Sequence, residues 1–262
     1  MGVLSYANSL MNRCGIKGIV LIDSRADGLH PPFPNLRQDM EKAGWRPIMV
    51  PAAANLPAAI ASHPDIQVCA LDAASAIVSP ELAGSVLQAM REAGVRVQLG
   101  VYPPSSAYPG DCIYNAVVSS NYFISGIRCA NPVLETEMQI RKLKPICVRQ
   151  GYVRCSLLPL PDDCFITADR GIAQTLNDNG LEHHLIAVDL DIYLPGYVHG
   201  FLGGCGGCAP DGTVFLSGNP VASGDISGSI ESFVSSKKHE FRVLSGEKLY
   251  DVGSLIFFMW GE

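Results

Sequence analysis

The sequence is poor in charged residues, and this shortage excludes some classes of partner. Only 17% of the 262 residues are charged, with 19 Lys and Arg against 25 Asp and Glu and a formal net charge of −6. A protein that binds a phosphate backbone needs clustered Lys and Arg. The densest basic stretch, Lys237-Lys238-His239, is interpreted as a solvated helix end. We therefore expect no nucleic-acid partner.

Long hydrophobic runs are also missing. No stretch approaches the roughly 20 apolar residues that a membrane-spanning helix needs, and Leu255–Trp260 has the length of a core strand. Residues Met1–Cys14 lack the basic region that begins a secretory signal. The nine cysteines are an odd number and lie mostly in apolar strands, as free thiols do in a reducing compartment. The sequence thus predicts a cytoplasmic protein with no membrane segment.

What the sequence does have is a repeated strand–helix–strand unit. In the clearest copy, strands Gly151–Leu160 and Cys164–Thr167 precede a helix that Asp169 can cap and Gly180 can end, before a strand at Leu185–Val188. Four further copies share this plan, and their first strands are predicted at Ile19–Asp23, Ile66–Leu71, Asn121–Ser125 and Thr213–Ser217. One such unit cannot bury both of its faces, so the copies are expected to pack together.

The two ends of the repeat are complementary. Leu249–Met259 is a predicted strand with no helix after it, and the unit that begins at Ile19 lacks a strand before it. Pairing of these two segments would close a ring and remove the exposed sheet edges. We predict an α/β fold: a single domain over residues 1–262, with a lead-in at 1–18, in which five ββαβ units form a propeller closed by the C-terminal strand.

This plan resembles the pentein α/β-propeller of guanidine-modifying enzymes, which include dimethylarginine hydrolase, arginine and agmatine deiminases and glycine amidinotransferase. Tyr108-Pro109-Gly110-Asp111 is similar to their Glu-Gly-Gly-Asp segment. The phrases QGYVRCS, ITADRGIA and GYVHGFLGGCGG resemble an uncharacterised family with the same fold. The likeness extends from about Gly18 to Met259 and is best from Tyr108 onward. It implies a central channel, lined by the inner strands, that holds a small polar molecule.

The sequence departs from those enzymes at two catalytic positions. Gly253 stands where the resemblance places a nucleophilic cysteine, and Tyr152-Val153-Arg154 stands where it places a histidine. Asp111 alone carries over cleanly. The ribosome anti-association factors share this propeller without catalysis, so the fold does not by itself predict an enzyme.

Cys155 is the thiol that we predict to be the nucleophile. It lies in the polar group Arg154-Cys155-Ser156 within an otherwise apolar segment, and a neighbouring Arg154 could lower its pKa. The alternative is that Arg154 points outward and Cys155 packs in the core. His199 and Asp251 are predicted to assist proton transfer, with a loop histidine and a paired buried carboxylate as their alternatives.

Asp111 and Asn115 are predicted to bind the substrate. If the segment from Asp111 is a strand, these two side chains lie on the same face of it. Tyr152 and Arg154 complete the predicted substrate-binding set. A single CxxC at Cys205–Cys208 lacks further ligands at zinc spacing, so no metal and no cofactor are predicted.

These residues predict a cysteine-dependent hydrolase or transferase acting on an amidine- or amide-like molecule. The alternative is a non-catalytic member of the same fold that binds a metabolite or a protein.

Overall fold

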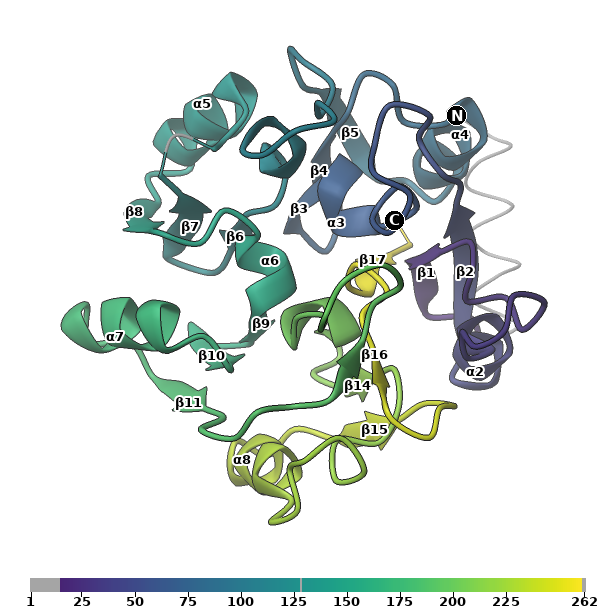
Figure 1. Ribbon diagram of the computed structural model, residues 1–262. Helices are drawn as coiled ribbons and strands as arrows, with labels where there is room; N and C mark the ends of the chain where they lie inside the picture. The colour runs from purple at the N-terminus through teal and green to yellow at the C-terminus, as the bar shows by residue number, and fades with distance from the viewer. Residues whose placement is uncertain (1–14, 128, 261–262) are drawn as a thin grey trace.

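The computed structural model describes residues 15–127 and 129–260 and contains five three-stranded sheets arranged around an axis (Figure 1). In each module an inner strand runs antiparallel to a middle strand, a helix follows on the outside of the ring, and an outer strand returns parallel to the middle one. In the order inner strand, middle strand, helix and outer strand, the first module is β17 (Ile256–Met259), β1 (Gly18–Asp23), α2 (Leu36–Lys42) and β2 (Trp45–Val50), and the second is β3 (Val68–Asp72), β4 (Ser75–Val78), α4 (Gly84–Glu92) and β5 (Arg96–Leu99). The third module is β6 (Val117–Val118), β7 (Tyr122–Gly126), α5 (Pro132–Ile140) and β8 (Lys144–Val148), and the fourth is β9 (Leu157–Leu160), β10 (Cys164–Thr167), α7 (Arg170–Asp178) and β11 (His183–Leu185). The fifth module is β13 (Gly206–Cys208), β14 (Val214–Leu216), α8 (Ser229–Ser236) and β15 (Phe241–Val243).

Local sequence signals account for the helix ends. The side chains of Asn131 and Asp169 accept hydrogen bonds from backbone N–H groups in the first turns of α5 and α7, as N-caps do. Gly44, Gly94 and Gly180 follow α2, α4 and α7 with positive φ, which glycine adopts without strain. These caps and stops fix the length of each helix and return the chain to the sheet.

The C-terminal strand closes the ring, as predicted. Strand β17 pairs antiparallel with β1, placing Gly18 opposite Met259 and Leu21 opposite Ile256. A second long-range pair, β12 (Ile192–Tyr193) with β16 (Leu249–Tyr250), ties the last two connections together. The core lies between neighbouring modules, with Phe258 and Ile19 fully buried. No helix within the described ranges has the length and apolar content to cross a bilayer.

Several strand predictions were wrong in detail. The strand predicted at Leu185–Val188 is β11, which covers His183–Leu185. Gly151–Leu160 is not one strand, because it begins with the one-turn helix α6 (Val153–Ser156) before β9. Asp111 lies in a 3₁₀ turn, η1 (Gly110–Cys112), rather than in a strand, so alternation along a strand does not relate it to Asn115. Leu249–Met259 is interrupted by a turn between β16 and β17, where Asp251 lies.

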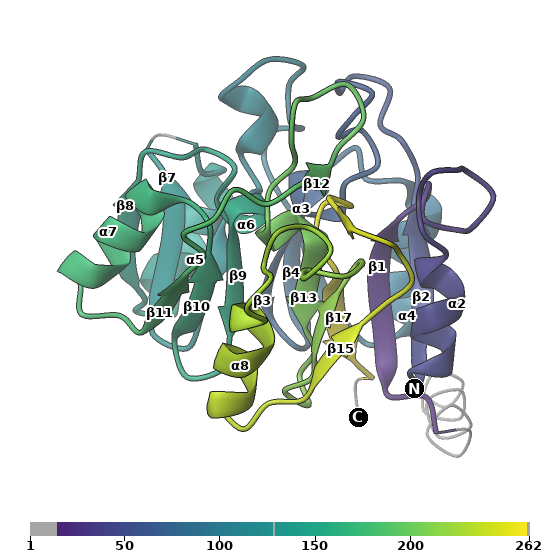
Figure 2. The same ribbon diagram turned by 60° about the horizontal axis from the view of Figure 1, so that its bottom comes forward.

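Each inner strand is preceded by a tight turn at the same end of the axis. Figure 2 shows two of these turns, α3 (Pro64–Gln67) and α6, at the end where the long loops rise. The other three are η2 (Gly203–Cys205), the segment 251–255 and the segment 110–116, which begins with η1. The fold therefore brings five short polar segments, far apart in the sequence, toward one point.

Candidate functional site

Hydrogen bonds join the five turns in a closed ring. Every turn contacts the next through a backbone group, so the order around the axis is that of the modules. The links are Asn115 Nδ2 to Asp65 O (3.1 Å), Arg154 N to Asn115 Oδ1 (2.7 Å), Arg154 Nη1 to Gly203 O (2.9 Å), Ser254 N to Gly204 O (2.9 Å) and Asp65 N to Gly253 O (3.1 Å).

Glycines allow this close approach. A Cβ on Gly203 would lie 2.3 Å from the carbonyl oxygen of Arg154, and one on Gly204 would lie 2.0 Å from Asp251 Oδ1. Real Cβ atoms do not approach other atoms so closely. The first two glycines of the GGCGG segment, Gly203 and Gly204, therefore permit the close packing of the turns.

This geometry predicts the effect of Gly204→Ala. The new methyl group displaces the Asp251 carboxylate, and overpacking of a core costs about 1–3 kcal/mol. We expect a loss of that size in the free energy of unfolding, measured by denaturant titration. Gly84→Ala is the matched control, because a Cβ there meets no atom within 4 Å. Equal stability of the two variants would contradict the tight ring.

Cys155 lies in the middle of a buried polar group at the centre of this ring. Its Sγ is 3.1 Å from Asp65 Oδ2 and 3.2 Å from Asn115 Nδ2. Ser254 Oγ donates to the same Asp65 oxygen at 2.6 Å. All four side chains are at most 3% exposed. We call these four residues, together with His63, the axial cluster.

His63 has no hydrogen-bond partner for either ring nitrogen among the described residues, although it is only 1% exposed. Its Nε2 lies 3.8 Å from Asp23 Oδ2 and its Nδ1 lies 3.9 Å from Asp251 Oδ1. Asp65 Oδ1 also has no partner in the described part of the chain. Buried polar atoms are almost always satisfied, so these exceptions mark a place where a ligand, an ion or water is needed.

Burial controls the protonation of the thiol. Removal from water raises the pKa of Cys155 well above its usual range, and the nearby carboxylates of Asp65 and Asp251 raise it further. Burial likewise raises the pKa of Asp251, with Asp65 contributing while His63 opposes the shift. Arg154 was predicted to lower this pKa, but the net shift is upward, because burial and the two carboxylates outweigh the attraction of the guanidinium. In this arrangement Cys155 is a thiol that donates to Asp65.

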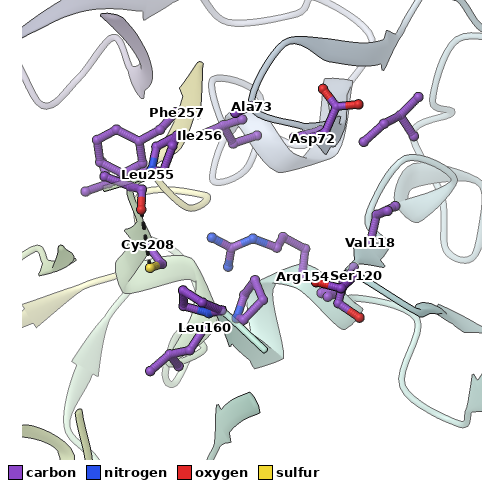
Figure 3. A pocket seen from close by; sticks show the side chains of 18 of the residues that line it. Asp72, Ala73, Val118, Ser120, Arg154, Leu160, Cys208, Leu255, Ile256 and Phe257 are labelled. Atoms are coloured by element: carbon purple, nitrogen blue, oxygen red, sulfur yellow. Dashed lines mark hydrogen bonds between the residues drawn. The ribbon is translucent and has the colours of Figure 1, made fainter. Parts of the chain in front are cut away.

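Arg154 points away from the axial cluster into a separate cavity of about 460 Å³, which is lined by the inner strands (Figure 3). Its guanidinium donates to the carbonyl oxygens of Leu157, Gly203 and Gly206. Burial lowers its pKa, with Asp65 acting in the opposite direction. Arg154 thus links two modules and presents a positive charge to this cavity.

The remaining predicted site residues fall in different places. Tyr152 OH donates to Asp111 Oδ2, and its ring stacks on Phe201 with centroids 6.1 Å apart. Burial, followed by this bond to Asp111, raises the pKa of Tyr152. His199 is exposed and lines a second cavity of about 560 Å³. Of the predicted residues, Asn115 and Cys155 are in the axial cluster and Asp251 borders it, whereas Asp111, Tyr152, Arg154 and His199 are not in it.

Sequence analysis missed three members of the cluster: His63, Asp65 and Ser254. His63 and Asp65 flank Pro64 at the end of a segment that looks like an Ala- and Pro-rich connection. Their signal is positional, because they precede the inner strand of the second module as Asn115 and Cys155 precede those of the third and fourth. Aligning the repeats on their inner strands would have revealed them.

The ring of five ββαβ modules defines the fold as a pentein α/β-propeller. The chain belongs to a family of unknown function, DUF6873, whose sequence model matches residues 33–256. A search of curated proteins found none that matches the chain.

Solved structures share this fold at low sequence identity. DDAH from Pseudomonas aeruginosa, in a complex with citrulline, matches with a TM-score of 0.50 and 10% identity, covering 88% of this chain and 92% of that one. The amidinotransferase SxtG from Microseira wollei matches with a TM-score of 0.52 and 8% identity, covering 88% and 90%. Agmatine deiminase from C. jejuni also has a TM-score of 0.52 and 8% identity, covering 99% and 87%. These similarities establish the fold.

The structure leaves no room for a side chain at position 253. A Cβ at Gly253 would lie 2.2 Å from the Cβ of His63 and 2.3 Å from its Cγ. Gly253 also has a φ of +66°, which an L side chain rarely adopts. The imidazole of His63 therefore occupies the space into which a side chain at position 253 would extend, and the thiol of the cluster comes instead from Cys155.

Proposed function

We propose that this protein is a cysteine-dependent hydrolase or transferase acting on a small cationic amidine or guanidine, with Cys155 as the nucleophile. The observation that carries the proposal is the position of Cys155 Sγ, 3.1 Å from the Asp65 carboxylate and 3.2 Å from the Asn115 amide. Three buried carboxylates lie at the cluster. Those of Asp23 and Asp251 lie beside His63, and that of Asp65 lies beside the Cys155 thiol. Only Asp23 has an arginine partner, Arg25, among the described residues. An acidic site of this kind complements a cation.

The geometry supports a direct proton path. Cys155 Sγ attacks the amidine carbon while its proton passes to Asp65 Oδ2, the S–C bond forms, and the C=N π pair moves to nitrogen. Asn115 Nδ2 holds the sulfur in place. Collapse of the tetrahedral adduct breaks the C–N bond, and the departing amine takes the proton from Asp65, directly or through His63. Water, or an acceptor amine in a transferase, then displaces sulfur and restores the thiol.

His63 has the position of a proton carrier. One of its ring nitrogens lies within 4.8 Å of a ligand atom on both Asp65 and Cys155. A catalytic acid or base must come within hydrogen-bond reach of the reacting atoms, and such contacts often tighten only when substrate binds. Its two unbonded nitrogens are available for this role because no neighbouring group in the described ranges occupies them.

Non-catalytic binding of a small anion is the second candidate, favoured by the cavity of about 460 Å³ that Arg154 lines. A guanidinium without a carboxylate partner in the described residues suits a carboxylate or phosphate ligand. In that case the cavity, and not the axial cluster, would be the functional site.

Labelling with matched reagents tests the first proposal. Chloroacetamidine is cationic, whereas chloroacetamide is neutral and of similar size. We expect the ratio of the chloroacetamidine rate to the chloroacetamide rate to be about tenfold or more higher at Cys155 than at exposed Cys147. A tenfold difference corresponds to about 1.4 kcal/mol of selective stabilisation of the cation. The rates are read at each thiol by peptide mass spectrometry, and Cys147 supplies the intrinsic reactivity ratio of the two reagents.

Asp65→Asn is expected to remove this preference at Cys155 and to leave the ratio at Cys147 unchanged. The same reagent preference at both thiols in the wild-type protein would contradict a cation-selective site and favour the second candidate.

A further inference from the structure

Three side chains of different chemistry converge in the axial cluster. His63, Asp65 and Cys155 each present one nitrogen, oxygen or sulfur atom, and these atoms all lie within 4.8 Å of one another. All three side chains are at most 3% exposed. They come from two modules of the propeller, and Asp65 and Cys155 are separated by 90 positions in the chain.

Unused bonding capacity accompanies this convergence. Both ring nitrogens of His63 and one carboxylate oxygen of Asp65 lack a hydrogen-bond partner in the described ranges. A buried donor or acceptor left unsatisfied costs about 1–3 kcal/mol. An ion coordinated by one His63 nitrogen and by Asp65 Oδ2 would satisfy that nitrogen, and the free Oδ1 of the same carboxylate could bind the ion as well.

We propose that His63, Asp65 and Cys155 form a binding site for one Zn²⁺ ion. Imidazole, carboxylate and thiolate are the three ligand types that zinc uses in proteins. The thiolate and carboxylate neutralise the charge of the dication. Binding releases the thiol proton to solvent as the Zn–S bond forms, so the step balances without a redox partner.

The spacing of the donor atoms suits a tetrahedral ion after small movements. Zn–N and Zn–O bonds of about 2.0–2.2 Å and a Zn–S bond of about 2.3 Å place tetrahedral ligands roughly 3.3–3.7 Å apart. Asp65 Oδ2 and Cys155 Sγ are 3.1 Å apart, and no pair of the three ligand atoms exceeds 4.8 Å. The widest pair therefore has to close by at most about 1.5 Å on binding.

The residues around His63 are those expected around a zinc ligand. A ligating histidine usually directs its second nitrogen at a carboxylate, which fixes the ring and raises its basicity. Asp23 lies 3.8 Å from Nε2 and Asp251 lies 3.9 Å from Nδ1, so either nitrogen can ligate while the other faces a carboxylate. Gly253 leaves room for the ring between them.

This site goes beyond the proposed activity and does not depend on it. Zinc on Cys155 would occupy the sulfur that attacks an amidine, so the ion would inhibit the activity proposed above. The test therefore measures metal binding and not turnover. If no metal binds, the labelling test of Cys155 as the nucleophile is unaffected.

Metal titration of the chelator-treated full chain provides the test. We expect one Zn²⁺ per chain in competition with a chromophoric chelator. Co²⁺, used as a spectroscopic substitute, is expected to give a thiolate-to-cobalt charge-transfer band. Cys155→Ser and Asp65→Asn should each weaken binding by about 100-fold or more, and Cys155→Ser should abolish the band. Near-ultraviolet circular dichroism checks that both variants keep the native fold.

Cys208→Ser is the matched control, because Cys208 belongs to the chain's CxxC pair and lines the other cavity. Its zinc affinity should equal that of the wild-type protein. Loss of binding in Cys208→Ser with retention in Cys155→Ser would move the site to the CxxC pair and overturn the proposal. The absence of saturable binding to the wild-type protein would overturn it as well.

Discussion

Replacing Cys155 with alanine is expected to abolish turnover of any amidine or guanidine that the wild-type protein converts. Loss of a covalent nucleophile lowers kcat by about three orders of magnitude or more, because the intermediate can no longer form. Cys155→Ser should be nearly as inactive, since a buried hydroxyl beside Asp65 is a much weaker nucleophile. Release of ammonia or amine, followed over a panel of small amidines, measures the effect.

Cys164→Ala is the control for this experiment. Cys164 is another buried free thiol, but it lies on the middle strand β10 and does not belong to the axial cluster. Its removal should leave kcat within about a factor of two or three, although stability falls by an amount typical of a small core truncation. Full activity of Cys155→Ala would eliminate the proposed mechanism.

Phe258→Ala is expected to cost about 3–5 kcal/mol of the free energy of unfolding, the range for a fully buried phenylalanine. Phe258 is completely buried on the closing strand β17, where its backbone lies opposite Ile19 of β1. Folded domains are stable by only about 5–15 kcal/mol, so this one change should remove a large part of the total. Denaturant titration with two spectroscopic probes measures the loss.

The next residue on the same strand supplies the comparison. Met259 is 38% exposed, and Met259→Ala should cost less than about 1 kcal/mol. The contrast between adjacent positions tests both the closure of the ring and its register, because a shift of one residue would exchange the two faces. Equal losses at the two positions would contradict the pairing of β17 with β1.

The propeller could be predicted from sequence because its determinants are local and repeated. Asn131, Asp169 and Gly180 mark helix ends within single units, and the missing strand before Ile19 points to the surplus strand at the C-terminus. Boundaries were less predictable. Gly151–Leu160 has the apolar content of a strand, but its first residues form α6 because they meet the turns of neighbouring modules at the axis.

The candidate site was only partly predictable because its residues meet through long-range contacts. Asp65 and Cys155 are 90 positions apart, and Ser254 reaches the same carboxylate from 189 positions away. No local spacing pattern encodes such a meeting. Cys155 was found because a polar group interrupts an apolar segment there. Asn115 was found because it was placed on one strand face with Asp111, although Asp111 lies in a 3₁₀ turn. His63 and Asp65 were hidden in a segment rich in Ala and Pro.

The orientation of a side chain is also absent from sequence. Arg154 and Cys155 are neighbours, which predicts an ion pair, but on the one-turn helix α6 they point to different sides of the ring. Arg154 donates hydrogen bonds to carbonyl oxygens of the fifth module, and the Cys155 thiol faces the Asp65 carboxylate of the second module. Adjacent residues on a helix diverge by about 100°, and this divergence separates them.

The most direct test of the axial cluster as the reactive site is a crystal structure of the protein after reaction with chloroacetamidine. We predict continuous density from Cys155 Sγ to the reagent, with the amidinium group within hydrogen-bonding distance of Asp65 or Asp251. An unmodified Cys155 in a crystal whose exposed Cys147 carries the reagent would contradict the account.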